Sequence, residues 1–217
     1  MDKPLAKYID HTILKPEATK DEVMQVINEA KQYGFASVCV NPYWVELAAT
    51  ELKETDVNVC TVVSFPLGAT STFAKVSETS EALKDGAVEI DMVQNVGALL
   101  SGDEQTVRED IKAVALATHA GNAILKVILE NAFLTDEQIK RACELALEAG
   151  ADFVKTATGF AKSGAKAADV RLMRETVGDK LGVKAAGGIH TKAESLAMIE
   201  AGASRIGASA SIAIVTE

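Results

Sequence analysis

Residues 135–156, TDEQIKRACELALEAGADFVKT, hold one complete helix-to-strand unit. Thr135 and Gln138 match the pattern of a capping box, which begins a helix. The helical spacing then continues to Gly150, a residue that can end a helix in the left-handed conformation. The short apolar run at 153–156 follows as a buried strand. This stretch therefore predicts a helix, a glycine stop and a strand in direct succession.

The same unit recurs from one end of the chain to the other. Gly34, Gly86 and Gly202 repeat the glycine stop, and Thr191 with Glu194 repeats the capping box. The predicted strands are 8–12, 35–40, 58–64, 88–93, 123–130, 153–156, 183–186 and 205–208. The predicted helices are 20–33, 43–54, 72–85, 103–119, 135–149, 167–177 and 191–201. Eight strands that alternate with helices predict an α/β fold, a single (β/α)8 TIM barrel that forms one domain over residues 1–217.

The bulk composition suits this fold and excludes some kinds of partner. Of the 217 residues, 48% are hydrophobic, 24% are charged and only 5% are aromatic, which is typical of parallel strands covered by helices. The formal net charge of −9 argues against a nucleic-acid surface, because proteins that follow a phosphate backbone carry a basic excess. A small phosphorylated metabolite can still be bound by a few lysines or backbone N–H groups.

The cysteines and the N-terminal segment indicate the cellular compartment. Cys39, Cys60 and Cys143 are odd in number and widely spaced in apolar runs, so reduced thiols are favoured over a disulfide framework. The first residues, MDKPLAKYIDHT, have no apolar signal region, and no later apolar run is long enough to span a bilayer. We expect a cytoplasmic protein with no membrane segment, for which a homodimer is one allowed assembly.

Two lysines stand at the ends of the sixth and seventh predicted strands: Lys155 in DFVKT and Lys184 in GVKAA. A single strand lysine is more often an edge charge that reaches solvent, but a closed barrel has no edge to expose two neighbours. An amine must be uncharged to attack a carbonyl. A second ammonium about 6 Å away, at an effective dielectric of about 20, raises the energy of the charged form by roughly 2.8 kcal/mol. The pair therefore predicts a lysine nucleophile that its neighbour helps to discharge.

Three further charged residues lie on predicted strands. Asp91, in VEIDMV, either neutralises a barrel lysine or transfers protons during carbinolamine formation and C–C cleavage, and both roles can hold together. Asp10 either orients a substrate hydroxyl or caps the loop after the first strand, and the sequence does not favour one over the other. Lys126 lies further inside its strand, and we expect it to support the charge network, for instance by pairing with Asp91.

The loops after the last two strands predict a phosphate site. Gly187 and Gly188 follow the seventh strand, and Gly207 with Ser209 ends the eighth strand before a short terminal helix. Barrels commonly bind phosphate at these loops through bare backbone N–H groups. Gly159, soon after Lys155, offers a further approach to the anion. A lone Gly-Gly is usually only a turn, and it is the placement of these glycines that favours phosphate.

Five motifs together carry a family resemblance: IDHT at 9–12, SVCVNP at 37–42, EIDMV at 89–93, FVKTATG at 153–159 and VKAAGGI at 183–189. With them, the chain resembles the deoxyribose-phosphate aldolases over essentially its whole length. The resemblance implies reversible cleavage of 2-deoxy-D-ribose 5-phosphate to D-glyceraldehyde 3-phosphate and acetaldehyde. It implies that Lys155 forms the Schiff base, that Lys184 favours its uncharged form and that Asp91 transfers protons.

The remaining expected site residues fall into two groups. Substrate contacts are expected at Asp10, Thr12, Cys39, Lys126 and Thr158. Phosphate contacts are expected at Gly159, Gly187, Gly188, Gly207 and Ser209. The resemblance implies that Cys39 lies at a position that reactive aldehydes attack. The alternative is that Cys39 is simply a small, buried hydrophobic residue.

Two segments depart from the common pattern of the family. After Ser209 the family usually continues with Ser-Gly, whereas this chain has Ala210 and Ser211, so we expect one phosphate contact and some flexibility to be lost. In the loop after Gly159, Ala161 and Lys162 replace the more usual glycine and uncharged residue.

We expect neither a metal nor another cofactor. A metal-dependent aldolase needs clustered histidine and carboxylate ligands, but the three histidines at 11, 119 and 190 are scattered in the sequence. The rival hypotheses are a sugar-phosphate isomerase on the same barrel and a non-catalytic phosphosugar-binding protein. An inert binding protein would have no need for two facing lysines.

Overall fold

The computed structural model describes residues 3–217, so the first two residues of the predicted domain lie outside the described residues. Eight parallel strands pair in sequence order, and β8 pairs with β1, which closes the sheet into a barrel. The strands are β1 Ile9–Ile13, β2 Ser37–Val40, β3 Asn58–Val63, β4 Glu89–Val93, β5 Ile124–Ile128, β6 Phe153–Lys155, β7 Gly182–Ala186 and β8 Arg205–Ala208. This arrangement confirms the predicted (β/α)8 TIM barrel.

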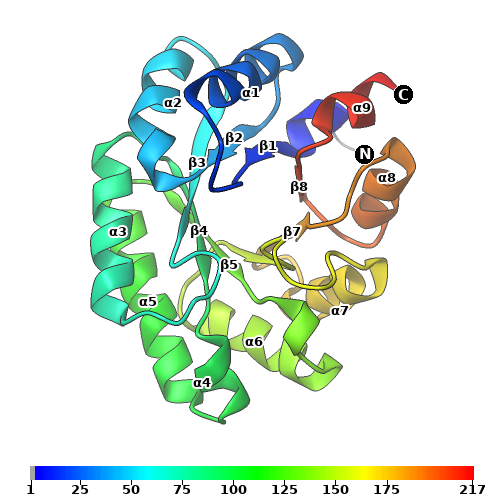
Figure 1. Cartoon of the computed structure of the whole chain (residues 1–217). Helices are drawn as coiled ribbons and strands as arrows, with labels where there is room; N and C mark the ends of the chain where they lie inside the picture. The colour runs from blue at the N-terminus through cyan, green and yellow to red at the C-terminus, as the bar shows by residue number, and fades with distance from the viewer. Residues whose placement is uncertain (1–2) are drawn as a thin grey trace.

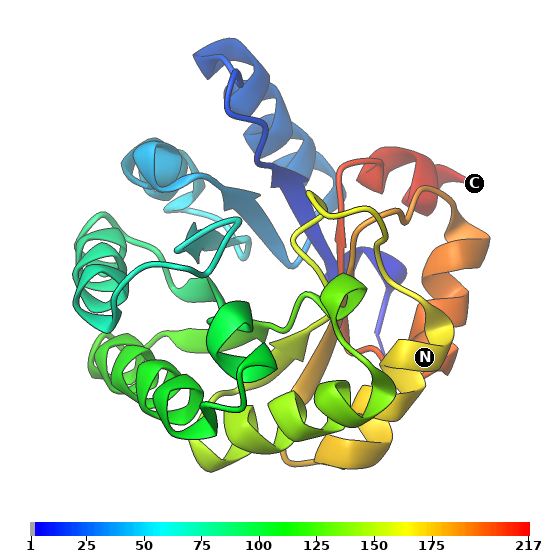
Figure 2. The ribbon, with the colours of Figure 1, turned by 60° about the horizontal axis from the view of Figure 1, so that its bottom comes forward.

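Helices cover the outside of the barrel in a ring, as Figures 1 and 2 show. They are α1 Lys20–Tyr33, α2 Val45–Leu52, α3 Thr72–Lys84, α4 Val96–Leu100, α5 Glu104–Ala120, α6 Asp136–Glu148, α7 Ala167–Val177, α8 Lys192–Glu200 and α9 Ser211–Thr216. Their buried apolar faces pack against the outward side chains of the strands in one continuous core. No helix among residues 3–217 is long and apolar enough to cross a lipid bilayer.

The local signals explain where the helices begin and end. Both predicted capping boxes are confirmed, and Thr19 with Glu22 forms a third at the start of α1. Gly34 ends α1 in the left-handed conformation with φ of 65°, as the glycine pattern predicts. The predicted second helix is too long, because Pro42 begins a short 3-10 turn that precedes α2. The short helix α4 was not predicted and is inserted between β4 and the main helix α5.

Strand alternation sends an unusual set of charged side chains into the barrel. Asp91 pairs with Lys126 across β4 and β5, and Lys155 pairs with Lys184 across β6 and β7. Because partners at matched register point to the same side of a sheet, and because successive residues alternate sides, these charges share the interior. The barrel therefore collects strand charges that lie far apart in the sequence.

A buried ion pair outside the barrel interior links helices α3 and α5 to the end of β4. Lys75 in α3 lies 2.5 Å from Asp110 in α5, and its Nζ also donates to the carbonyl oxygen of Val93 at 2.9 Å. Both charged side chains are buried. Either charge alone would be uncompensated in a low-dielectric interior, so the pair depends on both members being present.

We expect Lys75→Met to lower the free energy of unfolding by about 3–5 kcal/mol, because it leaves the Asp110 carboxylate buried without its cation. Urea unfolding followed by circular dichroism measures the change. Lys84→Met is the matched control, since Lys84 pairs with Glu81 at 2.8 Å on the exposed surface and should contribute little to the free energy of unfolding. Equal, small losses in the two variants would contradict this account of the buried pair.

Candidate active site

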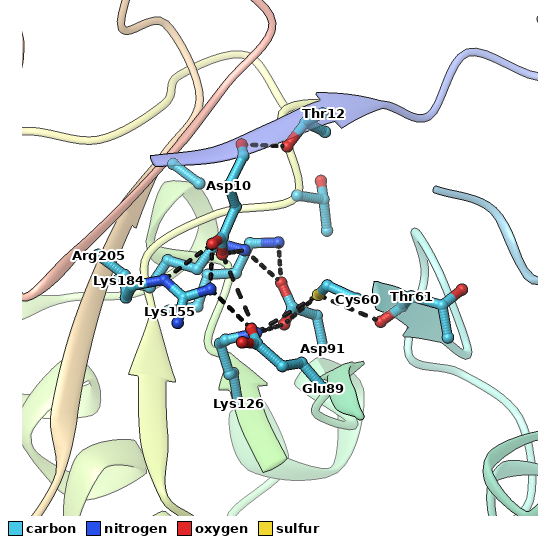
Figure 3. Close-up of polar contacts among 12 residues, drawn as sticks. Asp10, Thr12, Cys60, Thr61, Glu89, Asp91, Lys126, Lys155, Lys184 and Arg205 are labelled. Carbon is cyan, nitrogen blue, oxygen red and sulfur yellow. Dashed lines mark hydrogen bonds and ion pairs between the residues drawn. The ribbon is translucent and has the colours of Figure 1, made fainter. Parts of the chain in front are cut away.

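Asp91 holds two lysines together inside the barrel (Figure 3). Its Oδ2 lies 2.7 Å from Lys155 Nζ and 2.7 Å from Lys184 Nζ, so both ammonium groups share one carboxylate oxygen. Its other oxygen, Oδ1, accepts from Lys126 Nζ at 2.8 Å. The two lysines on adjacent strand ends thus face each other, as expected from sequence, but a carboxylate oxygen lies between them.

Two more carboxylates and a guanidinium complete this cluster of seven charged residues, which we call the interior charge cluster: Asp10, Glu89, Asp91, Lys126, Lys155, Lys184 and Arg205. Glu89 contacts Lys126 Nζ at 2.6 Å and an Arg205 nitrogen at 2.7 Å. Asp10 contacts Lys184 Nζ at 2.5 Å and also bonds to Arg205. The network shares each acid between at least two cations.

Opposite charges hold most of the cluster ionised despite its burial. Burial alone would raise the pKa of Asp91, but Lys126, Lys155 and Lys184 outweigh it and hold that pKa well below its ordinary value. The same balance lowers the pKa of Asp10 and Glu89. Burial pulls down the pKa of Lys184, yet Asp10 and Asp91 prevail and raise it above its usual range. The pKa values of Lys126 and Arg205 are raised in the same way.

The interior charge cluster therefore has four basic groups and three carboxylates among the described residues. Loss of one proton makes it electrically balanced. Lys155 contacts one carboxylate, Asp91, whereas Lys184 contacts both Asp10 and Asp91. Lys155 is therefore the basic group that the cluster holds least tightly. The structure adds one feature to the lysine pair predicted from sequence: Asp91 Oδ2 lies between the two amine nitrogens, 2.7 Å from each.

A cavity of about 690 Å³ opens at the carboxyl ends of β6, β7, β8 and β1. Of the three interior lysines that the structure describes, Lys155 lines this cavity, while Lys126 and Lys184 lie behind it. All five glycine and serine positions predicted for phosphate line it: Gly159, Gly187, Gly188, Gly207 and Ser209. The amine of Lys155 and the glycine loops thus line the same cavity.

Two glycines lie where the cavity loops closely approach other parts of the barrel. A Cβ on Gly207 would lie 3.1 Å from Lys184 Cε, so glycine lets β8 pass close to that lysine. A Cβ on Gly164 would lie 2.1 Å from the carbonyl oxygen of Gly187, which places the loop after β6 directly against the end of β7. The N–H of Ala165 also donates to the carbonyl oxygen of Gly187 at 2.9 Å.

Thr12 and Thr158, the two predicted substrate contacts that line the cavity, are fixed by hydrogen bonds. Thr12 Oγ1 donates to the carbonyl oxygen of Asp10 at 2.8 Å. Thr158 Oγ1 donates to buried Glu130 at 2.5 Å and accepts from the N–H of Phe160 at 3.0 Å. Glu130 adopts the left-handed conformation with φ of 57°, which is costly for a residue with a side chain. Glu130 therefore holds the loop that carries Thr158 and Gly159.

Asp10, Cys39 and Lys126 lie below the cavity rather than on its wall. Asp10 is fully buried against Arg205 and Lys184, and the first helix is capped by Thr19, so Asp10 caps no helix. Cys39 packs in a small apolar cluster beside Cys60, its register partner on β3. Of these three, Asp10 and Lys126 contact the other members of the interior charge cluster directly.

Cys39, Cys60 and Asp91 place two sulfur atoms and a carboxylate oxygen within 4.8 Å of one another. These donors suit a thiophilic cation. However, Lys126 Nζ lies 3.3 Å from Cys60 Sγ and 2.8 Å from Asp91 Oδ1, so an ammonium already neutralises this space. Burial also raises the pKa of the Cys60 thiol well above its ordinary value, which opposes its conversion to a thiolate ligand.

Sequence reasoning missed Glu89, Arg205 and Glu130 as site residues. Glu89 lies two residues before Asp91 on one strand, so period-two alternation would have placed both on the same face. Arg205 begins β8 at the register of Lys184. The sequence gives no comparable signal for Glu130. Its role depends on a contact with Thr158, which lies 28 residues further along the chain.

Comparisons with known proteins agree on one family. The model of the DeoC/LacD family aldolases matches residues 5–214. The chain is 60% identical over 211 residues to a deoxyribose-phosphate aldolase of Bacillus mycoides (strain KBAB4), which covers 97% of this chain and 94% of that protein. Among solved structures, it is similar to a putative deoxyribose-phosphate aldolase from Coccidioides immitis, at 45% identity and a TM-score of 0.95, with 97% and 84% of the two chains covered.

A deoxyribose phosphate aldolase from Aeropyrum pernix, described as having a unique tetrameric structure, is also similar, with 31% identity and a TM-score of 0.91. That match covers 97% of this chain and 89% of the other. The match to the family model spans nearly all of the described barrel, including both lysine strands and the glycine loops. On these grounds, the chain belongs to the DeoC/LacD family of aldolases.

Proposed function

We propose that this aldolase reversibly cleaves 2-deoxy-D-ribose 5-phosphate to D-glyceraldehyde 3-phosphate and acetaldehyde, with Lys155 as the Schiff-base lysine. One observation carries the assignment: Lys155 is the interior lysine that lines the cavity, opposite the glycine loops, while it contacts Asp91 behind it. The names of the relatives support the substrate. The proposal needs no cofactor, because the iminium nitrogen itself accepts the electrons of the broken bond.

In the first half of the proposed reaction, neutral Lys155 attacks the aldehyde carbon C1 of the open-chain substrate and forms a carbinolamine. Loss of water gives an iminium. A base then removes the proton of the C3 hydroxyl, the C2–C3 bond breaks, and its electron pair moves to C2 and the iminium nitrogen. D-Glyceraldehyde 3-phosphate leaves, and a two-carbon enamine remains on Lys155. Protonation of C2 and hydrolysis then release acetaldehyde and restore the amine.

The interior charge cluster supports two separate roles in this scheme. Lys184 stays an ammonium, because the carboxylates of Asp10 and Asp91 raise its pKa against the effect of burial, and its fixed charge favours a neutral Lys155. Asp91 is placed to carry protons at 2.7 Å from Lys155 Nζ. The neighbouring lysines hold the pKa of Asp91 well below its ordinary value. We therefore assign the proton transfer to those steps of the reaction in which Lys155 carries no positive charge.

Substrate recognition is proposed to divide between two sets of residues. Thr12 and Thr158 face the sugar hydroxyls. The loops of Gly159, Gly187, Gly188, Gly207 and Ser209 receive the phosphate through backbone N–H groups. Asp10 and Lys126 support the lysines from below, and we extend the same indirect role to Cys39.

We also propose that residues 1–217 form one aldolase domain that acts in the cytoplasm as a homodimer. The three buried cysteines are unpaired, which fits a reducing compartment. Sedimentation equilibrium tests the assembly, and a tetramer, as described for the relative from Aeropyrum pernix, would replace the dimer.

Treatment with acetaldehyde and sodium borohydride should add a stable two-carbon group to Lys155, because hydride reduces the iminium that this lysine forms. Peptide mass spectrometry locates the adduct. Lys155→Leu should neither be labelled nor release acetaldehyde from 2-deoxyribose 5-phosphate in a coupled assay. An adduct located on Lys184 instead would contradict the assignment, because Lys184 lies behind the cavity.

Lys184→Leu should retain slow turnover with a pH optimum above that of the wild-type enzyme. Removal of this cation takes away the fixed positive charge that, in the proposed scheme, favours the neutral amine needed for attack, so full activity requires a higher pH. The pH profile of kcat measures the shift. Lys192→Leu is the control, since that lysine begins helix α8 outside the barrel interior. An unchanged or more acidic optimum in Lys184→Leu would show that the charge balance does not govern Lys155.

A further inference from the structure

We propose that Ser211 is a positioning residue for phosphate recognition, which it serves by tying the loop after β8 to β1 and α1 through His11 and Glu29. The proposal rests on the function proposed above and extends it to a residue that does not itself line the cavity.

A continuous set of contacts joins three elements at this place. His11 Nδ1 on β1 lies 2.8 Å from Ser211 Oγ, which belongs to the first residue of α9. His11 Nε2 lies 2.7 Å from Glu29 Oε2 on α1. Ser211 Oγ also lies 3.0 Å from the carbonyl oxygen of Ala208, the last residue of β8. We call these four residues the serine–histidine latch.

The proton positions in the latch follow from the acceptors around it. The Glu29 carboxylate only accepts, so His11 Nε2 carries a proton and donates it. Burial lowers the pKa of His11 against the opposing effect of Glu29, which favours a neutral ring. Nδ1 of a neutral ring then accepts from Ser211 Oγ–H, and the carbonyl oxygen of Ala208 competes for the same hydroxyl proton. Replacing the serine leaves Nδ1 without its partner.

The latch lies directly against the proposed phosphate loop. Gly207 and Ser209 flank Ala208, and His11, Glu29 and Ala208 line the same cavity as both of them. Ser211 is fully buried, so it fixes this loop from behind and contacts no ligand. A residue without a hydroxyl at this position would have no group to bond His11. The serine therefore adds a restraint to a loop in which the sequence predicted the loss of one phosphate contact and of some flexibility.

The test compares 2-deoxyribose 5-phosphate with 2-deoxyribose, which lacks the phosphate. For Ser211→Ala we expect the KM of the phosphorylated substrate to rise roughly threefold to tenfold, about the effect of one hydrogen bond, with little change in kcat. The kinetics with 2-deoxyribose should stay at the wild-type values. Ser211→Thr, which keeps the hydroxyl, should restore the KM. Ser195→Ala is the matched control, because Ser195 is fully buried and its Oγ has no hydrogen-bond partner among the described residues.

Binding of inorganic phosphate by calorimetry provides the second measurement, and it requires no turnover. Ser211→Ala should weaken this binding by the same factor as the KM rise, and Ser195→Ala should not. An equal loss with both sugars, or unchanged phosphate binding, would overturn the positioning role. Failure of the wild-type enzyme to cleave either sugar would instead contradict the proposed reaction, and phosphate binding would still decide the role of Ser211.

Discussion

The shared carboxylate of Asp91 is the contact on which the rest of the site depends. It bonds to Lys126, Lys155 and Lys184, three buried lysines from three different strands. A buried ammonium without a counter-ion would be expelled or discharged, so the strands can present lysines inward only because acids meet them there. Alternation and register supply these acids, because they bring inward-facing residues of β1, β4, β5, β6, β7 and β8 into one cluster.

Lys155 differs from Lys126 and Lys184 in its position, because it lines the cavity and they lie behind it. Lys126 and Lys184 are enclosed by acids, and their raised pKa values keep them charged. Lys155 meets one acid on one side and the cavity on the other. In the proposed reaction, the enclosed lysines therefore serve as fixed charges, and the lysine that lines the cavity serves as the nucleophile.

The fold was predictable from sequence because its signals are local and repeated. The capping boxes, the helix-ending glycine at 34 and the short apolar runs each specify one element, and eight strands leave a closed barrel as the simplest arrangement. The lysine pair was predictable for the same reason, since adjacent strand ends must meet. Glu89 and Arg205 were harder to recognise, because a charge at the start of a strand resembles a solvent-exposed end until the register is known. The loop contacts of Glu130 and Ser211 depend on packing between distant segments, which no local pattern encodes.

The backbone contact between Gly164 and Gly187 limits how the loop after β6 can evolve. No side chain fits at residue 164, so one end of the loop is fixed to β7, while Glu130 holds the other end through Thr158. Between these anchors, Phe160 donates its N–H to Thr158 at 3.0 Å and packs its ring edge-on against Phe65 at 5.3 Å, whereas Ala161 is half-buried and Lys162 is exposed. Sequence drift or laboratory diversification can therefore change the chemistry of this rim at residues 161 and 162 with less effect on the path of the chain. The same changes at residue 164 would displace the end of β7 and, with it, the cradle at Gly187 and Gly188.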